Sequence, residues 1–395
     1  MASEWRQIPI IECIDLIGGG TPKTSVAEYW DGDIPWLSVK DFNNDYRHVY
    51  ATEKHITEAG LNNSSTKLLQ KEDIIISARG TVGEMAIIPF PMAFNQSCYG
   101  IRAKTGVNST FLYYLLKNSI SKLKLMTHGS VFDTITRDTF ATLIVGIPDR
   151  ETQDVIANTL AAIDDKIELN NKINDNLYVQ ARAITNHWIA ENEGDYELLP
   201  LNEIAAINPD TYSPKQEWEY VNYLDTSSIT DGYIADVQRI TPSNEKLPSR
   251  ARRIISANDV VFSTVRPNQR HFGIISEPLP NMLASTGFAV IRSKHPLVCN
   301  ELIYLCLTEN VFIEKMQQLA EQSTSTFPSI KPSDLGVCEI PCPKDDSSSN
   351  LAETLKAMFV LIAANNRENT YLAELRDTLL PKLMSGEIDV SNIEI

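Results

Sequence analysis

The sequence predicts an α+β fold: two mixed α/β domains separated by two long helices that pair as an antiparallel coiled coil, with a pseudo-two-fold internal repeat. Three observations lead to this prediction. The 395-residue chain exceeds what one hydrophobic core usually supports. It repeats itself at a distance of 195 residues. Each copy passes from short strand-like runs into a long helical pattern, which predicts four segments: residues 1–150, 151–195, 196–345 and 346–395.

The repeat is clearest in the second part of each copy. Residues 157–177 and 352–372 share nine identities in 21 aligned positions, where chance would give one or two. The same register extends back without a gap through Ile135 and Ile330 to Phe132 and Phe327. A duplicated unit of this size indicates two similar domains related by a pseudo-two-fold axis, because solenoid repeats are much shorter.

The first part of each copy alternates short β-rich runs with turn residues, which is typical of a mixed α+β globule. The expected strands lie at residues 73–77, 85–88, 97–102 and 143–147, and at 221–224, 260–264, 273–275 and 288–291. One helix interrupts each series, at residues 109–125 and at residues 300–319.

The second part of each copy is polar and helical, with seam residues alternately four and three positions apart, as in the a/d seam of a coiled coil. The first seam consists of Ile156, Leu160, Ile163, Ile167, Asn170, Asn174, Leu177, Ala181, Ile184 and Trp188. The second has the same spacing and consists of Leu351, Leu355, Met358, Ile362, Asn365, Asn369, Leu372, Arg376, Leu379 and Leu383. A single amphipathic helix of this length needs a partner face, so we expect the two helices to pack on each other. Pro381 and Gly386 mark the expected end of the second helix.

The asparagines interrupt both seams at the same heights. They are either exposed polar positions or buried residues that set the register, and their matching placement favours the second interpretation. Helices of roughly 36–40 residues would span about 55–60 Å. Two domains held apart by such a length suit a DNA target with two half-sites about one turn, or roughly 34–36 Å, apart.

The charge distribution limits how this chain could bind DNA. The net charge is −16, and ten of these excess charges lie in residues 151–195 and 346–395, whereas residues 1–150 carry a net charge of only −1. The acid is thus concentrated in the helical segments. We expect no tight unaided binding to DNA, and partners would have to neutralise many of the phosphates.

Composition also restricts the cellular location and the cysteine chemistry. No apolar run is long enough to cross a bilayer, and the N-terminus lacks the pattern of a secretion signal. The six cysteines form no CxxC pair. Cys338 and Cys342 are closest in sequence and are interpreted as buried small residues rather than metal ligands. A cytoplasmic protein is expected.

Several motifs together resemble those of type I restriction specificity subunits. The first is Gly19-Gly20-Thr21-Pro22, followed by the run YWDGDIPWL at residues 29–37. The run SARGTVG at residues 77–83 and the pair Asn95-Gln96 come next. After each domain, ETQDVIANTLAAIDDKIELNN from Glu151 and LRDTLLPKLMSGEI from Leu375 are similar to the helical segments of that family. The second domain departs from the first, with Asn208-Pro209-Asp210 and Val265-Arg266-Pro267 at the corresponding places.

This resemblance implies a non-catalytic recognition subunit in which each domain reads one half of a bipartite DNA site. It also implies a complex of one such chain with two adenine-methylating subunits, which dock on the helices, and with restriction subunits that translocate DNA. S-adenosylmethionine and ATP would bind to those partners, and this chain would hold no cofactor.

The residues themselves offer no catalytic machinery. The stretch from Asn208 to Asp210 lacks the second proline of an adenine methyltransferase loop, and residues 18–24 lack the glycine that precedes lysine in a phosphate-binding loop. Residues 148–153 lack the lysine of a nuclease site, and the six histidines show no metal-ligand spacing. We therefore expect no enzyme activity and no metal site.

Candidate DNA contacts are loop residues that combine hydrogen-bond donors with a flexible backbone. In the first domain they are Gly20, Thr21, Lys23, Arg79, Gly80, Thr81, Ser130 and Arg137. In the second they are Arg250, Arg252, Arg253, Arg266, Asn268, Gln269, Arg270, Ser323, Thr324, Ser329 and Lys331. For each of them, a plain turn, a surface ion pair or a solvated face is the alternative.

The function that these observations favour is sequence-specific DNA recognition within a restriction–modification complex. A specificity subunit of a solitary methylation system without cleavage fits the sequence equally well. The alternative from another class is a coiled-coil scaffold whose globular domains bind proteins.

Overall fold

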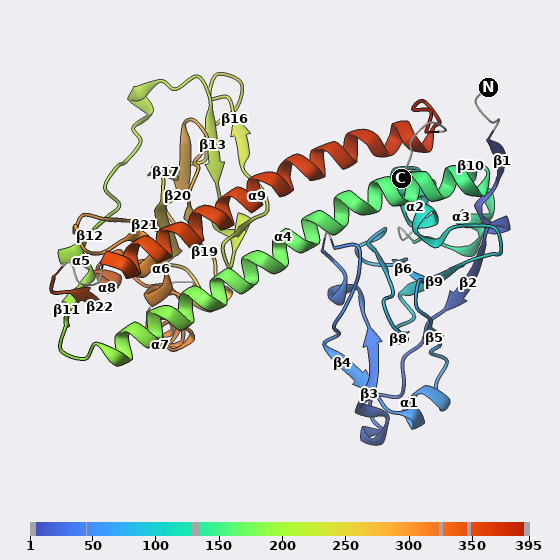
Figure 1. Cartoon of the computed structure of the whole chain (residues 1–395), viewed down its shortest axis with the longest axis horizontal. Coiled ribbons are helices and arrows are strands. Elements are labelled where there is room, and N and C mark those ends of the chain that lie inside the picture. Colours follow the sequence, from blue (N-terminus) through green and yellow to red (C-terminus); the bar gives the residue numbers. More distant parts are fainter. Residues whose placement is uncertain (1–4, 45, 128–133, 324–326, 346–348, 391–395) are drawn as a thin grey trace. The chain divides into compact units, whose positions relative to one another are not determined.

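The computed structural model describes residues 5–44, 46–127, 134–323, 327–345 and 349–390. By their internal contacts, the residues form two compact units. Unit 1 comprises residues 1–170 and 368–395, and unit 2 comprises residues 171–367. Both boundaries fall inside a long helix, so each unit consists of a globule and one half of each helix (Figure 1).

The two long helices are α4, Arg150–Glu191, and α9, Ser349–Met384. Asp149 caps the start of α4, because its carboxylate accepts a hydrogen bond from the amide of Thr152 (2.9 Å). The helix α9 continues past Pro381, and the left-handed Gly386 (φ +73°) follows its end.

The predicted antiparallel pairing of the helices is present in each unit. In unit 1, Ile156 and Leu160 of α4 share a core with Leu380 and Leu383 of α9. In unit 2, the later part of α4 shares a core with the earlier part of α9, through Ala181, Leu355 and Ile362 among others. No residue of either seam is exposed.

The asparagines hydrogen-bond to each other across the helices. In unit 1, Asn170 is fully buried and donates to Asn369 (2.9 Å) and to Glu368 (2.8 Å). In unit 2, Asn174 is 6% exposed, donates to Asn366 (2.9 Å) and accepts from Asn365 (2.8 Å). Because each amide finds a partner only in one alignment, these contacts set the register of the helices.

Globule 1, residues 6–147, contains three sheets, with strand orders β1-β10, β2-β9-β6-β7 and β4-β3-β8-β5. Its strands are β1 Arg6–Pro9, β2 Ile14–Gly18, β3 Trp30–Leu37, β4 Lys54–Ile56, β5 Leu68–Leu69, β6 Ile74–Ser77, β7 Met85–Ile87, β8 Met92–Phe94, β9 Cys98–Ala103 and β10 Ile144–Ile147. Its helices are α1 Glu58–Asn62, α2 Ser109–Thr127 and α3 Arg137–Thr142.

Globule 2, residues 196–343, contains the matching sheets β11-β22, β12-β21-β18-β19 and β16-β13-β20-β17, and a small hairpin β14-β15. Its strands are β11 Tyr196–Pro200, β12 Ala205–Ile207, β13 Val221–Leu224, β14 Ile229–Thr230, β15 Tyr233–Ile234, β16 Gln238–Ile240, β17 Ala251–Ile254, β18 Asp259–Ser263, β19 Phe272–Ile275, β20 Met282–Ser285, β21 Phe288–Ser293 and β22 Glu339–Pro343. Its helices are α5 Leu201–Ile204, α6 Asn300–Leu307, α7 Asn310–Glu321 and α8 Pro332–Gly336.

The two globules therefore repeat one topology. In each, one four-stranded sheet is antiparallel and the other contains a single parallel pair, β3 with β8 and β13 with β20. The same ion pair occurs in both globules, between a buried aspartate and an arginine of the neighbouring strand. Asp73, just before β6, binds Arg102 of β9 (2.6 Å), and Asp259 of β18 binds Arg292 of β21 (2.7 Å). The repeat inferred from the helices thus extends through the whole chain.

Each unit is layered in the same way. In β6, Ile74 and Ile76 face the core shared with α2 and α4, whereas Ile75 faces the core under the second sheet. The alternation recurs in β18, where Val260 and Val261 belong to different cores. Both faces of the antiparallel sheet are covered, so its strands consist of continuous apolar runs.

The expectation of one helix over residues 300–319 is wrong, because the segment forms α6 and α7. The backbone of Glu309 is extended (ψ 139°) and interrupts the helix. Arg182 of α4 donates to the hydroxyl of Thr308 (2.9 Å) and pairs with Glu309 (3.1 Å). A cation at this position stabilises the C-terminal end of α6.

Candidate nucleic-acid interface

Three loops that carry sequence motifs meet in unit 1. They are residues 19–23 after β2, residues 78–84 between β6 and β7, and residues 95–97 between β8 and β9. The amide of Ala78 donates to the carbonyl of Ser97 (2.8 Å), and the hydroxyl of Thr21 donates to Gln96. The glycine-rich, SARGTVG and Asn-Gln motifs therefore form one cluster at the ends of their strands.

Gly20, a candidate DNA contact, has a structural role in its loop. Its amide already donates to the carbonyl of Phe94 (2.9 Å), and the residue is buried. A Cβ atom there would lie 2.3 Å from Ser65 Oγ and from the amide nitrogen of Thr66, so only glycine fits. Lys23 is exposed and remains a candidate contact.

The loop after β6 presents Arg79 to solvent. Arg79 and Thr81 are exposed, and Gly80 adopts a left-handed conformation (φ +79°). Ser77 fixes the base of the loop, because its hydroxyl donates to the carbonyl of Thr81 and accepts from the amide of Glu84 (2.9 Å). Arg79 makes no ion pair with any described residue, so its guanidinium is available to a ligand.

Two other candidates of the first domain have different outcomes. Arg137 is exposed, but its guanidinium donates to the carbonyl of Leu16 (3.2 Å), which ties α3 to β2. Ser130 lies outside the described residues.

The corresponding loop of unit 2, residues 264–271 between β18 and β19, is anchored in the same way. The amide of Thr264 donates to the carbonyl of Gly287 (2.8 Å), as Ala78 does to Ser97. Arg266 adopts a left-handed conformation (φ +47°), uncommon for a residue with a side chain. Its guanidinium lies 5.0 Å from the ring centroid of Phe327 and forms no ion pair with a described residue.

Arg270 is half-buried, and neighbouring side chains hold its guanidinium. Its guanidinium binds Asp231 (2.6 Å) and Asn310 (3.0 Å), and it lies 5.3 Å from the ring of Phe272. These contacts fix the end of the loop, so Arg270 positions it. Asn268 and Gln269 are exposed between the two arginines.

A second segment of unit 2 lies beside this loop. Ser329 forms a β-bridge with Val265, and the amide of Arg266 donates to the carbonyl of Pro328 (2.9 Å). Lys331 is exposed and precedes α8, its amide bonded to Asp334 (2.7 Å). Ser323 is half-buried, and Thr324 lies outside the described residues.

The expected patch of Arg250, Arg252 and Arg253 is not a single exposed surface. Arg250 is exposed, and its carbonyl accepts from the amide of Thr286 (2.8 Å). Arg252 and Arg253 are half-buried, and each has a buried guanidinium nitrogen without a hydrogen-bond partner among the described residues. Burial lowers the pKa of Arg253. Arg252 lines a hollow of about 570 Å³ with Tyr212 and Trp218.

Sequence reasoning could not separate Arg266 from Arg270, because Asp231 lies 39 residues from Arg270. It also named Gln96 only as part of a motif, although this residue binds Thr21. The common signal is a loop directly after a buried strand in each copy of the repeat.

Within the described residues, no group of three or more histidine, cysteine or acidic side chains is placed to hold a metal ion. No helix in that part of the chain combines the length and apolar character needed to cross a membrane.

The chain is similar to proteins of one family. Residues 2–178 match the family model described as "Type I restriction modification DNA specificity domain". The MjaIX specificity subunit of Methanocaldococcus jannaschii is 26% identical, with 99% of this chain and 95% of the relative aligned. The HindI specificity subunit of Haemophilus influenzae is 24% identical over 70% of this chain and 77% of its own.

A solved structure shows the same fold. The S subunit of a type I restriction–modification system from M. genitalium matches with a TM-score of 0.57 at 17% identity, covering 97% of this chain and 96% of that one. The family model covers the first globule and residues 150–178 of α4, and the aligned relatives extend through the second globule. Residues 2–178 therefore carry a type I restriction modification DNA specificity domain, and the chain as a whole is similar to type I specificity subunits.

Proposed function

We propose that this chain is the DNA-reading subunit of a type I restriction–modification complex and that each globule reads one half of a bipartite site. One observation carries the proposal: the two globules have the same strand order but present different side chains from the equivalent loop. Globule 1 presents the exposed Arg79 and Thr81, and globule 2 presents the half-buried Arg266 with the exposed Asn268 and Gln269. Equal scaffolds with unlike loops suit two unlike half-sites.

The exposed loop side chains have the chemistry that this role needs. An arginine fork can donate two hydrogen bonds to guanine, and asparagine or glutamine can bind adenine in the major groove. Lys23, Arg250 and Lys331 would contact phosphates near these loops and fix the position of the protein on the duplex. Thr21, Ser323 and Ser329 would add neutral contacts.

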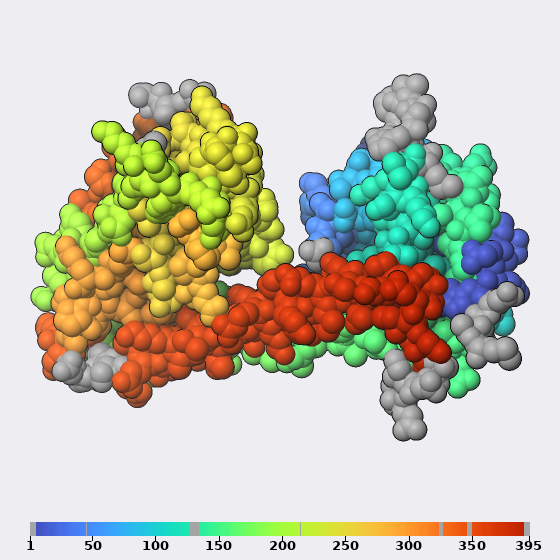
Figure 2. Space-filling model, turned by 90° about the horizontal axis from the view of Figure 1, so that it is seen from above, coloured from blue at the N-terminus to red at the C-terminus, as the bar shows by residue number. Residues whose placement is uncertain are grey.

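The partners would supply the chemistry and much of the positive charge. With a net charge of −16, the chain needs basic partners to bind DNA tightly. We infer that two methyltransferase subunits dock on the helices and hold S-adenosylmethionine, and that restriction subunits hold ATP. Much of the surface of α9 is uncovered, as Figure 2 shows. Its exposed apolar side chains include Val360 (67% exposed) and Leu361 (54%) in unit 2 and Tyr371 (64%) in unit 1, which would suit such docking. The complex would act on DNA in the cytoplasm, and the chain itself would carry no catalytic site.

Reciprocal loop variants test the division of labour between the globules. The chain is expressed with its methyltransferase partner, and the methylated motif is read by sequencing the methylome. Arg266→Ala should relax one half of the motif, and Arg79→Ala should relax the other half, in each case by about 10–100-fold in preference at one base. Arg239→Ala is a matched control, because that guanidinium stacks 4.0 Å from the ring of Tyr220 and is not in either loop.

Removal of the whole gene, the two variants and restriction assays together separate the alternatives. A methylome that does not change when the whole gene is removed would favour the coiled-coil scaffold over a DNA reader. If either arginine variant altered both halves, the assignment of one half-site to each globule would be wrong. Restriction assays on the same strains distinguish a cleaving complex from a solitary methylation system.

A further inference from the structure

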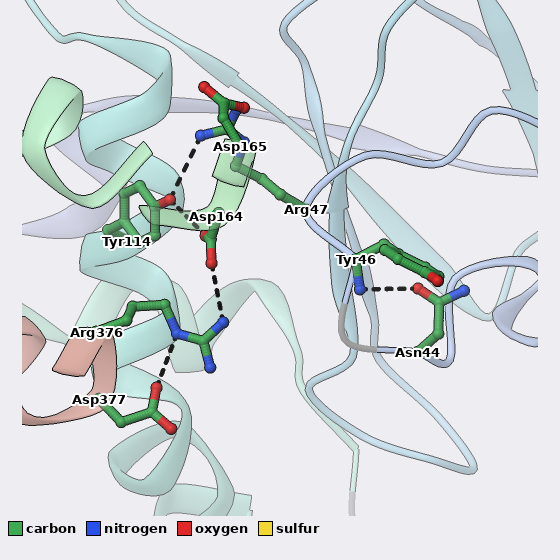
Figure 3. A network of polar contacts seen from close by, with 8 residues as sticks. All are labelled: Asn44, Tyr46, Arg47, Tyr114, Asp164, Asp165, Arg376 and Asp377. Atoms are coloured by element: carbon green, nitrogen blue, oxygen red, sulfur yellow. Dashed lines mark hydrogen bonds and ion pairs between the residues drawn. The ribbon is translucent and has the colours of Figure 1, made fainter. Parts of the chain in front are cut away.

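A buried layer of charged groups lies between the two helices of unit 1. Asp164 of α4 accepts hydrogen bonds from the hydroxyl of Tyr114 (2.5 Å) and from the guanidinium of Arg376 on α9 (2.9 Å) (Figure 3). The side chains of Asp164 and Arg376 are only 8% and 9% exposed. This is an ion pair between the helices that water hardly reaches.

Further polar groups complete the layer. Arg376 also binds Asp377 (2.8 Å), and Arg47 binds Asp165 and lies 3.5 Å from the hydroxyl of Tyr114. Burial alone would lower the pKa of Arg376, but its hydrogen bonds to the two aspartates outweigh burial and raise the pKa. Both arginines therefore remain cationic.

The equivalent layer of unit 2 is apolar. The repeat distance of 195 residues relates Asp164 to Phe359 and Arg376 to Ala181. One heptad from the Asn174–Asn366 contact, Ala181 and Phe359 fall opposite each other, 0% and 4% exposed. The ring of Phe359 packs on Tyr178 (5.4 Å between centroids) and on Tyr304 (5.7 Å).

Stability alone does not explain the charged layer. Replacing a buried ion pair by well-packed apolar side chains is often neutral or stabilising. Unit 2 contains such an apolar solution at the related position of the same fold. We therefore ask which alternative helix pairings the ion pair of unit 1 would exclude.

The internal repeat creates a choice between pairings. Because α4 and α9 have similar seams, each helix could pair with the same helix of a second copy of this chain. Glu368, which binds Asn170 and Lys166, differs between the helices, but it is exposed to water. The asparagines themselves cannot discriminate, since Asn170 and Asn174 correspond to Asn365 and Asn369 and the two helices carry the same amides. They set the register in either pairing.

We propose that the layer of Asp164 and Arg376 selects the pairing of α4 with α9 in one chain and excludes pairing with a second copy. In an α4–α4 pair, Asp164 would face Ala181, and in an α9–α9 pair, Arg376 would face Phe359. Each wrong pairing thus buries a charge without the opposite charge that the facing helix supplies, and Arg376 would keep only the largely exposed Asp377 of its own helix. The correct pairing supplies a buried partner to both residues. Because this layer differs between the two copies of the repeat, it favours the pairing of α4 with α9 of the same chain.

The test uses the full chain, cut only after folding. The turn between α4 and β11 contains Gly194, which is exposed and left-handed (φ +109°). A Cβ atom there would meet nothing within 4 Å, and the carbonyl accepts one hydrogen bond, from the exposed Lys344 (2.6 Å), so a protease site fits in this turn. After cleavage, the two fragments are held together by the helices. Incubation in mild denaturant lets them exchange partners, and native mass spectrometry distinguishes the heterodimer from the two homodimers by mass.

The selectivity should depend on the layer. In the cleaved wild type, homodimers should stay below about one in a hundred dimers. In the double variant Asp164→Phe with Arg376→Ala, both layers have the side chains of unit 2, and homodimers should rise at least tenfold above those of the wild type. Contacts of α4 with globule 2, such as that of Arg182 with Glu309, still favour the heterodimer, so fully random pairing is not expected. A double variant that forms only heterodimers would overturn the proposal, and so would a wild type that forms homodimers.

A second double variant decides the matter if the first one fails to fold. Asp164→Asn with Arg376→Gln keeps the approximate volume and the capacity for hydrogen bonds but removes the charges. Homodimers should exceed those of the wild type at least tenfold, and the same level as the wild type would refute the role of charge. The matched control is Arg367→Ala, which removes an exposed ion pair of α9 with Glu277 and should leave only heterodimers.

Discussion

The two globules hold the helices with opposite chemistry. In unit 1, Arg47, His48 and Tyr50 of the globule approach acidic residues of α4, with Tyr50 bonded to Glu168 (2.9 Å). In unit 2 the cation is on the helix, where Arg182 of α4 binds Glu309 and Thr308 of the globule. The two globules have the same order of strands, but the charged side chains with which they contact the helices differ.

This difference has a consequence for exchanging domains. A copy of globule 2 placed in unit 1 would bring Glu309 towards Asp377 of α9, which the repeat distance of 195 residues relates to Arg182, and would lose the contacts of Arg47. Like charges at that contact are destabilising. Globules from relatives should therefore be exchanged only at the same position of the chain, together with the matching half of each helix.

The largest effect is expected from breaking the charged layer on one side only. Arg376→Ala leaves Asp164 buried with Tyr114 but without its cation, and should cost unit 1 about 3–5 kcal/mol of unfolding free energy. Asp164→Phe combined with Arg376→Ala should recover most of this loss, because no buried charge remains. Hydrogen exchange read by mass spectrometry on peptides of α2 and α9 measures the stability of unit 1. An Arg376→Ala protein as stable as the wild type would show that the layer is not a buried ion pair in solution.

A smaller effect is expected from the apolar layer of unit 2. Phe359→Leu shrinks the side chain opposite Ala181 and removes the ring contacts with Tyr178 and Tyr304, at a cost of about 1–2 kcal/mol. Hydrogen exchange should increase in peptides of α6 and the first half of α9. Val360→Ala is the control, since Val360 is 67% exposed and its truncation should cost less than about 0.5 kcal/mol. Equal losses in both variants would contradict the tight packing of Phe359.

The helices could be predicted from the sequence because their signal is local. A 3.5-residue period requires only neighbouring residues, and it identified both seams although Pro381 lies inside the second helix. The order of the strands could not be predicted, because β6 pairs with β9 and β7 through contacts that no short pattern encodes. The break between α6 and α7 was missed for the same reason, since Arg182 contacts it from far along the chain.

The candidate interface was predicted at the level of loops but not of side chains. A turn after a buried strand is visible in sequence, so the loops at residues 78–84 and 264–271 were found in both copies. Whether an arginine is free depends on distant acids, and Asp231 removes Arg270 from the free donors. The charged layer was missed, although Arg376 at a seam position was a sign that an acid must lie opposite it.

The smallest effect concerns pH and the contact of globule 1 with α4. His48 lies with its Nδ1 atom 3.7 Å from Glu168. Burial, and next the charge of Arg47, lower the pKa of His48 below its ordinary value of 6.5, although Glu168 and Asp165 oppose this. Between these two pKa values the unfolded chain binds more protons than the folded one, so the stability of unit 1 should fall as the pH drops below about 6.5.

His48→Gln should remove this part of the pH dependence, because glutamine does not titrate. Unfolding by urea is measured from pH 7.5 to pH 5, and the difference between variant and wild type isolates the histidine. His55→Gln on β4 is the control, since it changes a histidine of the same globule that makes no ion pair with α4 among the described residues. A stability that rose as the pH fell would contradict this prediction. It would mean that protonated His48 forms an ion pair with Glu168 in the folded protein.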